Sequence, residues 1–115
     1  MIGSINFKVM QGDSFILRAE YKDPSGNLID LSDHEVIFKV RDQFGGRVTC
    51  ATASKEDGGI TSDDWTSGQF RIELTPTQTK KFTVPKAVYQ LQIVSSTGVK
   101  STLSYGTFSV EKGVI

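Results

Sequence analysis

Apolar and polar residues alternate with a period of two in five separate stretches of the chain. In one of them, Phe70, Ile72 and Leu74 are apolar while Arg71 and Glu73 are charged. Successive side chains of a β-strand point to opposite faces of its sheet, so the pattern predicts strands with one buried face. Strands solvated on the other face are typical of antiparallel sheets. The apolar positions of the other four stretches are Ile5, Phe7 and Val9; Phe15, Leu17, Ala19 and Tyr21; Val36, Phe38 and Val40; and Tyr89, Leu91 and Ile93.

Turn-forming residues separate these stretches. Asp23–Asn27 contains a proline followed by a glycine, which predicts a tight turn before a short strand around Leu28–Ile29. Ser95–Gly98 has the composition of a hairpin loop, and Gly45–Gly46 and Asp57–Gly59 mark two further breaks. Strands at roughly ten-residue spacing with turns between them predict a sandwich or a barrel.

Two segments depart from simple alternation. Near the end of the chain, Leu103 and Tyr105 occupy odd positions, whereas Phe108 and Val110 occupy even ones. A β-bulge inserts one residue and reverses the phase, and glycine tolerates its geometry, so we expect a bulge at Gly106.

The second departure is a helical signal in the middle of the chain. Thr75 is a good N-cap residue, and Pro76 follows at the first helical position. We therefore expect one short helical turn near Thr75–Lys81, serving as a connector between strands.

Length and charge narrow the function classes. The chain has 115 residues, which predicts a single domain over residues 1–115. Thirteen basic and thirteen acidic residues cancel, so the chain lacks the footprint of a general nucleic-acid binder or of a polybasic membrane anchor. We see no signal peptide and no apolar run of membrane-spanning length. We expect a soluble protein of a reducing compartment that binds neither nucleic acid nor membranes.

The rare reactive residues argue against catalysis. One cysteine and one histidine exclude an intrachain disulfide, a cysteine zinc cluster and any site with two imidazoles. Cys50 lies in a strand-like run, where a buried and inert thiol is usual. His34 has acidic neighbours, but no Gly-x-Ser-x-Gly elbow accompanies it. A loop histidine is the favoured interpretation, although a catalytic triad assembled in space stays open.

Two acidic pairs lie in the polar stretch between the strands. Glu56–Asp57 and Asp63–Asp64 are candidates for a calcium site or a glycosidase pair. Calcium loops place ligands at alternate positions, which these pairs do not, so an acidic surface loop is favoured. No phosphate-binding glycine loop is present. We therefore expect no metal, no cofactor and no enzymatic activity.

Five residues are candidates for interaction with a partner. Trp65 lies outside the strand pattern, where it serves either as an anchor or sugar-stacking platform, or as a lid over one end of the core. The chain begins and ends on apolar residues, whose burial against a partner would explain their exposure. Fraying of unstructured ends is the alternative. These terminal candidates are Met1, Ile2, Val114 and Ile115.

Several motifs, taken in order, resemble a family of small bacteriophage virion proteins. Val9–Phe15 resembles the family's QGD-[ST]-F opening, and Tyr21–Ser32 is similar to its W-K-D-x-x-G-x-P-x-D-L-T stretch. The resemblance covers nearly the whole chain and departs from the pattern at Tyr21, Leu28 and Gln90. Further matching stretches are Val36–Arg41, Asp57–Thr61, Leu74–Thr79, Val88–Ile93 and Tyr105–Val110.

The resemblance implies an immunoglobulin-like antiparallel β-sandwich of about seven or eight strands, similar to the N-terminal domain of phage baseplate upper proteins. It implies a standalone, non-catalytic docking module in the tail, baseplate or neck of the particle. The expected partners are other virion proteins and copies of itself. The expected location is the virion, assembled in the cytoplasm of the bacterial host.

Other functions stay open beside this hypothesis. A carbohydrate-binding or host-attachment module would stack a glycan on Trp65, Tyr21 or Tyr105, with exposed and coplanar rings. A head decoration protein is a second alternative. An enzyme would require His34 beside a serine or paired acids in a pocket. A small-molecule ligand is not expected.

Overall fold

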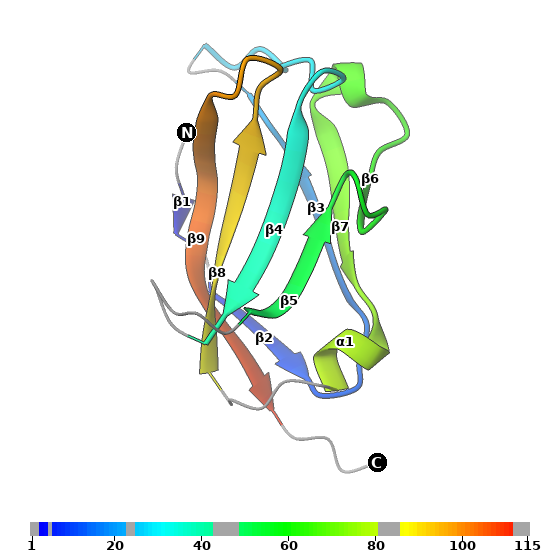
Figure 1. The fold of residues 1–115 in the computed structure, drawn as a ribbon, viewed down its shortest axis with the longest axis vertical. Helices are drawn as coiled ribbons and strands as arrows, with labels where there is room; N and C mark the ends of the chain where they lie inside the picture. The colour runs from blue at the N-terminus through cyan, green and yellow to red at the C-terminus, as the bar shows by residue number, and fades with distance from the viewer. Residues whose placement is uncertain (1–2, 5, 23–24, 43–48, 81–85, 112–115) are drawn as a thin grey trace.

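The protein is a sandwich of two β-sheets (Figure 1). The computed structural model describes residues 3–4, 6–22, 25–42, 49–80 and 86–111. Two short helices accompany the strands: η1 (Trp65–Ser67) and α1 (Pro76–Lys80). One sheet contains β3 (Phe15–Glu20), β6 (Ile60–Thr61) and β7 (Gln69–Leu74). The other contains β1 (Gly3–Ser4), β2 (Phe7–Met10), β4 (Glu35–Arg41), β5 (Thr49–Ser54), β8 (Lys86–Val94) and β9 (Lys100–Glu111).

The strand order is that of an immunoglobulin-like domain. The larger sheet runs β1-β9-β8-β4-β5, with β2 also pairing with β9, and it faces the order β3-β7-β6. If β1 and β2 are counted as two sections of one edge strand, the sandwich has eight strands. The predicted fold is therefore confirmed. Two pairings differ from the antiparallel expectation, because β1 and β2 both run parallel to β9.

The alternation seen in the sequence defines the core. In β4, Val36, Phe38 and Val40 are fully buried, and β7 alternates strictly between exposed and buried residues. A polar side chain, that of Thr79, is also fully buried. Its Oγ1 accepts a hydrogen bond from Gly12 N at 3.1 Å and donates to Asp13 O at 2.8 Å. Helix α1 is thereby attached to the turn between β2 and β3.

Aromatic rings join the two sheets. Phe15, on β3, inserts its ring among rings of the larger sheet, with centroids 5.3 Å from Phe7, 5.9 Å from Phe38 and 5.0 Å from Phe108. Tyr89 completes the group, 5.0 Å from Phe7 and 5.3 Å from Phe38. Aromatic pairs in this range add to the burial of their area, so this cluster stabilises the packing of one sheet on the other.

The expected helical turn is confirmed as α1. Thr75 Oγ1 accepts a hydrogen bond from Gln78 N at 3.2 Å, and Gln78 Oε1 accepts one from Thr75 N at 2.8 Å. This is a reciprocal capping box, which satisfies two free N–H groups at the helix start. Helix η1 was not expected. It begins where Asp64 Oδ1 accepts from Thr66 N at 3.1 Å.

The bulge in β9 lies at Leu103, and the expectation of Gly106 was wrong. Leu91 pairs with Ser104, but its neighbour Gln92 pairs with Thr102, so Leu103 is the extra residue. Ser104 lies on the inner face of β9, where its Oγ forms a hydrogen bond of 3.0 Å with the hydroxyl of buried Tyr89. A small polar residue in an inward position is invisible to a hydrophobic pattern, which is why the phase change seemed to fall later.

The structure describes some of the loops that the sequence predicts. The hairpin between β8 and β9 is closed by a hydrogen bond from Ser95 N to Val99 O at 2.9 Å, as predicted for Ser95–Gly98. The break at Asp57–Gly59 is confirmed between β5 and β6. Around the predicted turn at Asp23–Asn27, Lys22 and Leu28 form an isolated bridge, so the short strand predicted around Leu28–Ile29 was wrong. Asp23, Pro24 and Gly45–Gly46 lie outside the described residues.

Replacing Phe15 with alanine should destabilise the protein by about 3–5 kcal/mol, since it removes the ring that joins the two sheets. The neighbouring Ile16 is 54% exposed, and its replacement by alanine should change the free energy of unfolding by less than about 0.5 kcal/mol. Urea denaturation of both variants checks this. A similar loss in the two variants would contradict the role given to Phe15.

Gly68→Ala should cost more than Gly98→Ala. Both glycines have positive φ, 72° and 90°, which costs alanine about 1–2 kcal/mol. Only at Gly68 would the added Cβ also lie 2.7 Å from Ile29 O and 2.8 Å from Tyr21 O, whereas nothing lies within 4 Å at Gly98. Urea midpoints of the two variants measure the difference, and equal losses would show that backbone conformation alone matters.

Candidate functional site

The outer edge of β5 is capped by side chains. Lys55 N donates to Val36 O at 3.0 Å, so alternate residues Thr52 and Ser54 direct their backbone groups away from β4. Thr52 O accepts a hydrogen bond from Gln78 Nε2 at 3.3 Å, and Ser54 N donates to Asp57 Oδ1 at 2.9 Å. Capped edges resist pairing with another strand.

The outer edge of β3 has no such caps from the part of the chain that the structure describes. Tyr21 N donates to Gly68 O at 2.8 Å, which directs the odd-numbered residues of β3 towards β7. Backbone groups alternate sides along a strand, so those of Ile16, Arg18 and Glu20 point to the open edge. Among the described residues, β3 pairs with β7 alone, and nothing bonds to these edge groups. An edge of this kind is a template for another strand.

Two arginines lie opposite each other on the outer face of the β3–β7 pair. The register places Arg18 of β3 directly across from Arg71 of β7, at a position without mutual backbone hydrogen bonds. Side chains at such positions are closest, and like charges there are destabilising. Within the described part of the chain, neither arginine forms an ion pair. The pair therefore places two positive charges side by side next to the open edge.

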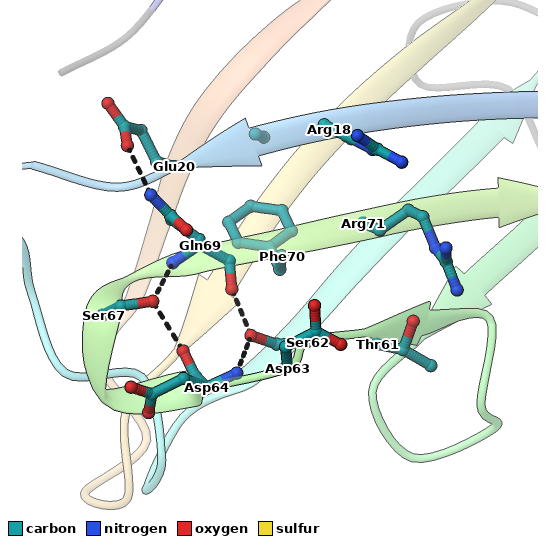
Figure 2. Close-up of a pocket in the computed structure, with 11 residues that line it drawn as sticks. Arg18, Glu20, Thr61, Ser62, Asp63, Asp64, Ser67, Gln69, Phe70 and Arg71 are labelled. Atoms are coloured by element: carbon teal, nitrogen blue, oxygen red, sulfur yellow. Dashed lines mark hydrogen bonds between the residues drawn. The ribbon is translucent and has the colours of Figure 1, made fainter.

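A shallow hollow of about 530 Å³ adjoins this pair. Figure 2 shows Arg18 and Arg71 on neighbouring strands, with the 62–67 segment at the other end of the hollow. That segment is fixed by hydrogen bonds: Ser62 Oγ donates to Gln69 O, and Asp64 N donates to Ser62 Oγ at 3.0 Å. The lining is mixed in charge and open to solvent, which suits contact with a protein surface better than enclosure of a small ligand.

Glu20 supplies a negative charge on the same edge strand as Arg18. Lys22 Nζ lies 2.9 Å from its carboxylate, and Gln69 Nε2 donates to it at 3.3 Å. These two hydrogen bonds lower the pKa of Glu20 below its ordinary value, so the group is ionised at neutral pH. The edge therefore presents a positive and a negative side chain two residues apart.

Trp65 packs as a lid over one end of the core. Its ring stacks on Phe70, with centroids 6.5 Å apart, and Lys55 Nζ lies 4.5 Å from its centroid. The same ammonium donates to Leu31 O at 3.1 Å, Ser32 O at 2.9 Å and His34 O at 3.1 Å. Lys55 thus joins the 31–34 turn to the tryptophan, and the contacts favour the lid over a free stacking platform.

The other candidates from the sequence take varied places. The terminal candidates Met1, Ile2, Val114 and Ile115 lie outside the described residues. Tyr21 is half-buried against the core, while Tyr105 is 42% exposed on the outer face of the larger sheet. The structure therefore does not bring Trp65, Tyr21 and Tyr105 together as one exposed aromatic surface.

The acids and the histidine that the sequence suggested do not come together in one reactive site. Asp57 and Asp64 serve as caps of local turns, and the described residues include no group of acids, histidines or cysteines that could hold a metal ion. Asp63 lines the hollow. His34 is half-buried and does not line the hollow, and its Nδ1 has no partner among the described residues.

Asp30, another acid close to His34 in the chain, has a local structural role. Ser32 N donates a hydrogen bond to Asp30 Oδ1 at 2.8 Å. Hydrogen bonds from the side chain and the backbone of Ser32 lower the pKa of the Asp30 carboxyl below its ordinary value. Asp30 therefore stabilises the start of the 31–34 turn rather than joining an acidic cluster.

The facing arginines are the feature that sequence reasoning missed. Both were correctly placed on outward positions of their strands, but β3 and β7 are far apart in the sequence. Nothing in a single sequence pairs those two strands or sets their register. The open edge of β3 was hidden for the same reason.

Comparison with known proteins supports the fold and little beyond it. No protein-family model matches the sequence, and no curated protein matches it at the level of sequence. Among solved structures, the N-terminal domain of phage TP901-1 ORF48 is similar with a TM-score of 0.58 and 11% identity, covering 97% of this chain and 100% of that one. CopC from Methylosinus trichosporium OB3b gives a TM-score of 0.51 and 10% identity, covering 96% and 87%. At these identities, the likeness shows a shared fold.

None of the helices in the described residues has the length and apolar character needed to cross a membrane.

Replacing Lys55 with methionine should lower the free energy of unfolding by about 1–3 kcal/mol, because three carbonyls lose a charged donor. Lys8→Met is the control, since Lys8 pairs with Glu111 through side chains that are 69% and 50% exposed, and should cost at most about 1 kcal/mol. Trp65 is the single tryptophan, so its emission should shift in Lys55→Met alone. An unchanged spectrum and equal stabilities would contradict the lid.

Proposed function

We propose that this chain is a structural, non-catalytic docking module of a bacteriophage particle. The observation that carries the proposal is the fold likeness to the N-terminal domain of a phage protein, which spans nearly the whole of both chains. The ordered motifs that resemble small virion proteins support the same function. Tail, baseplate and neck are the expected positions, with other virion proteins as neighbours.

The difference between the capped edge of β5 and the open edge of β3 supports docking as the mode of action. Gln78 and Asp57 cap β5, whereas none of the residues that the structure describes caps β3. Strand addition at an open edge provides affinity through main-chain hydrogen bonds and specificity through alternate side chains. Phe15 anchors the inner face of β3 in the aromatic cluster, and an edge that is preorganised for binding docks at a lower entropic cost.

Carbohydrate binding is less well supported by the side chains. Glycan-binding surfaces need exposed, coplanar rings, whereas Trp65 is half-buried with its ring in contact with Phe70 and Lys55, and Tyr105 lies on the other sheet. A head decoration protein is an alternative. The same kind of module would then lie on the capsid and not on the tail, baseplate or neck.

Immunogold labelling of purified phage particles tests this function. With an antibody against this chain, we expect label at a discrete position on the tail, baseplate or neck, and loss of that label from particles made without the chain. Label spread over the capsid would indicate head decoration. Intact particles without any label, with the chain left in the unassembled fraction, would refute a virion role.

A further inference from the structure

The open edge of β3 displays opposite charges in a fixed order. Its even-numbered residues direct their backbone groups outward and their side chains to the solvent face, in the order Ile16, Arg18, Glu20. Arg18 and Glu20 are both exposed. A positive and a negative side chain two residues apart can match a second copy of the same strand, if that copy runs antiparallel.

The register of such a pair decides whether the charges match. Two identical antiparallel strands are related by a two-fold axis, so each contact occurs twice. With the axis beside Ala19, Arg18 of each copy faces Glu20 of the other. With the axis beside Arg18, the two arginines face each other, and with the axis beside Leu17, Arg18 faces Ile16. Of these three registers, the one centred on Ala19 joins opposite charges.

The facing arginines supply a second, independent argument. Arg18 and Arg71 lie at a closely spaced cross-strand position and form no ion pair among the described residues. In the register centred on Ala19, Glu20 of the second copy lies across the edge from Arg18. That carboxylate, which also holds Lys22 of its own chain, would set a negative charge against the like-charge contact of the two arginines.

We propose that β3 is a self-pairing edge, along which two copies of this chain join antiparallel about a two-fold axis beside Ala19. The two small sheets then form one continuous sheet in the order β6-β7-β3-β3-β7-β6. In this register only residues 18–20 of each β3 lie opposite the other β3, so the contact is small, and the free dimer is weak and forms at high protein concentration. Many copies held in one assembly raise the effective concentration and make the same contact persistent.

This inference rests on the proposed docking function and names one partner for it, a second copy of the chain. The two can fail separately. A chain that labels the particle but never pairs with itself retains the docking function and loses the self-pairing edge.

Charge exchange across the axis provides a sharp test by sedimentation equilibrium. R18E and E20R each place like charges opposite each other in a homodimer, so each should weaken self-association by at least about tenfold. The double variant R18E/E20R restores the order of charges and should dimerise again. An equimolar mixture of the two single variants should form a heterodimer, because every facing pair is then opposite in charge.

Matched controls separate pairing from net charge and from misfolding. Lys86→Glu and Glu56→Arg make the same charge changes at exposed positions on other elements, and should leave self-association unchanged. Thermal unfolding of each variant confirms that it folds. Raising the salt concentration should weaken the wild-type dimer, because exposed ion pairs are screened.

Amide hydrogen exchange locates the contact without any substitution. The amides of Arg18 and Glu20 should become protected as the protein concentration rises, while those of Leu17 and Ala19, already bonded to β7, should not change. A chain that stays monomeric at all concentrations overturns the proposal. So does a dimer that survives both single reversals, or a mixture of the single variants that fails to associate.

Discussion

The ring of Phe15 lies between the two sheets, and the rest of the fold depends on that contact. Antibody domains join their sheets with a disulfide, but this chain has a single cysteine and cannot form one within itself. The aromatic cluster takes over the task, with Phe15 from the smaller sheet packed against three phenylalanines of the larger one. Because the sheets meet through large interlocking rings, their relative position is held by shape rather than by a covalent bond.

The same strand that carries Phe15 also carries the candidate interaction edge. Alternation along β3 sends Phe15, Leu17 and Ala19 towards the core and the intervening residues towards solvent. The buried ring therefore fixes the register and orientation of Arg18 and Glu20. The edge of β3 is thus an open edge on a strand anchored in the core. The edge of β5 is instead closed by side chains from α1 and from the turn that follows β5.

Local signals in the sequence were accurate for α1 and for the β8–β9 hairpin, where neighbouring residues decide the structure. The capping threonine and the proline after it start α1, and Ser95–Gly98 closes the hairpin it predicts. The errors arose where distant residues decide. Ser104 lies inward because the hydroxyl of Tyr89 is its partner, which moved the bulge to Leu103. Trp65 and the acids Asp57 and Asp64 took on structural tasks that no local pattern distinguishes from functional ones.

The sequence by itself determined the longer alternating strands, their buried faces and the class of the fold, because hydrophobic burial acts on each strand through its own alternation. It placed Arg18 and Arg71 on outward positions but could not bring them together. Only the tertiary structure decided that β3 pairs with β7, that their register sets the two arginines face to face, and that the other edge of β3 is left open among the described residues. Strand pairing joins residues distant in the chain through backbone groups that every residue shares. The side-chain pattern therefore holds no record of which strands meet.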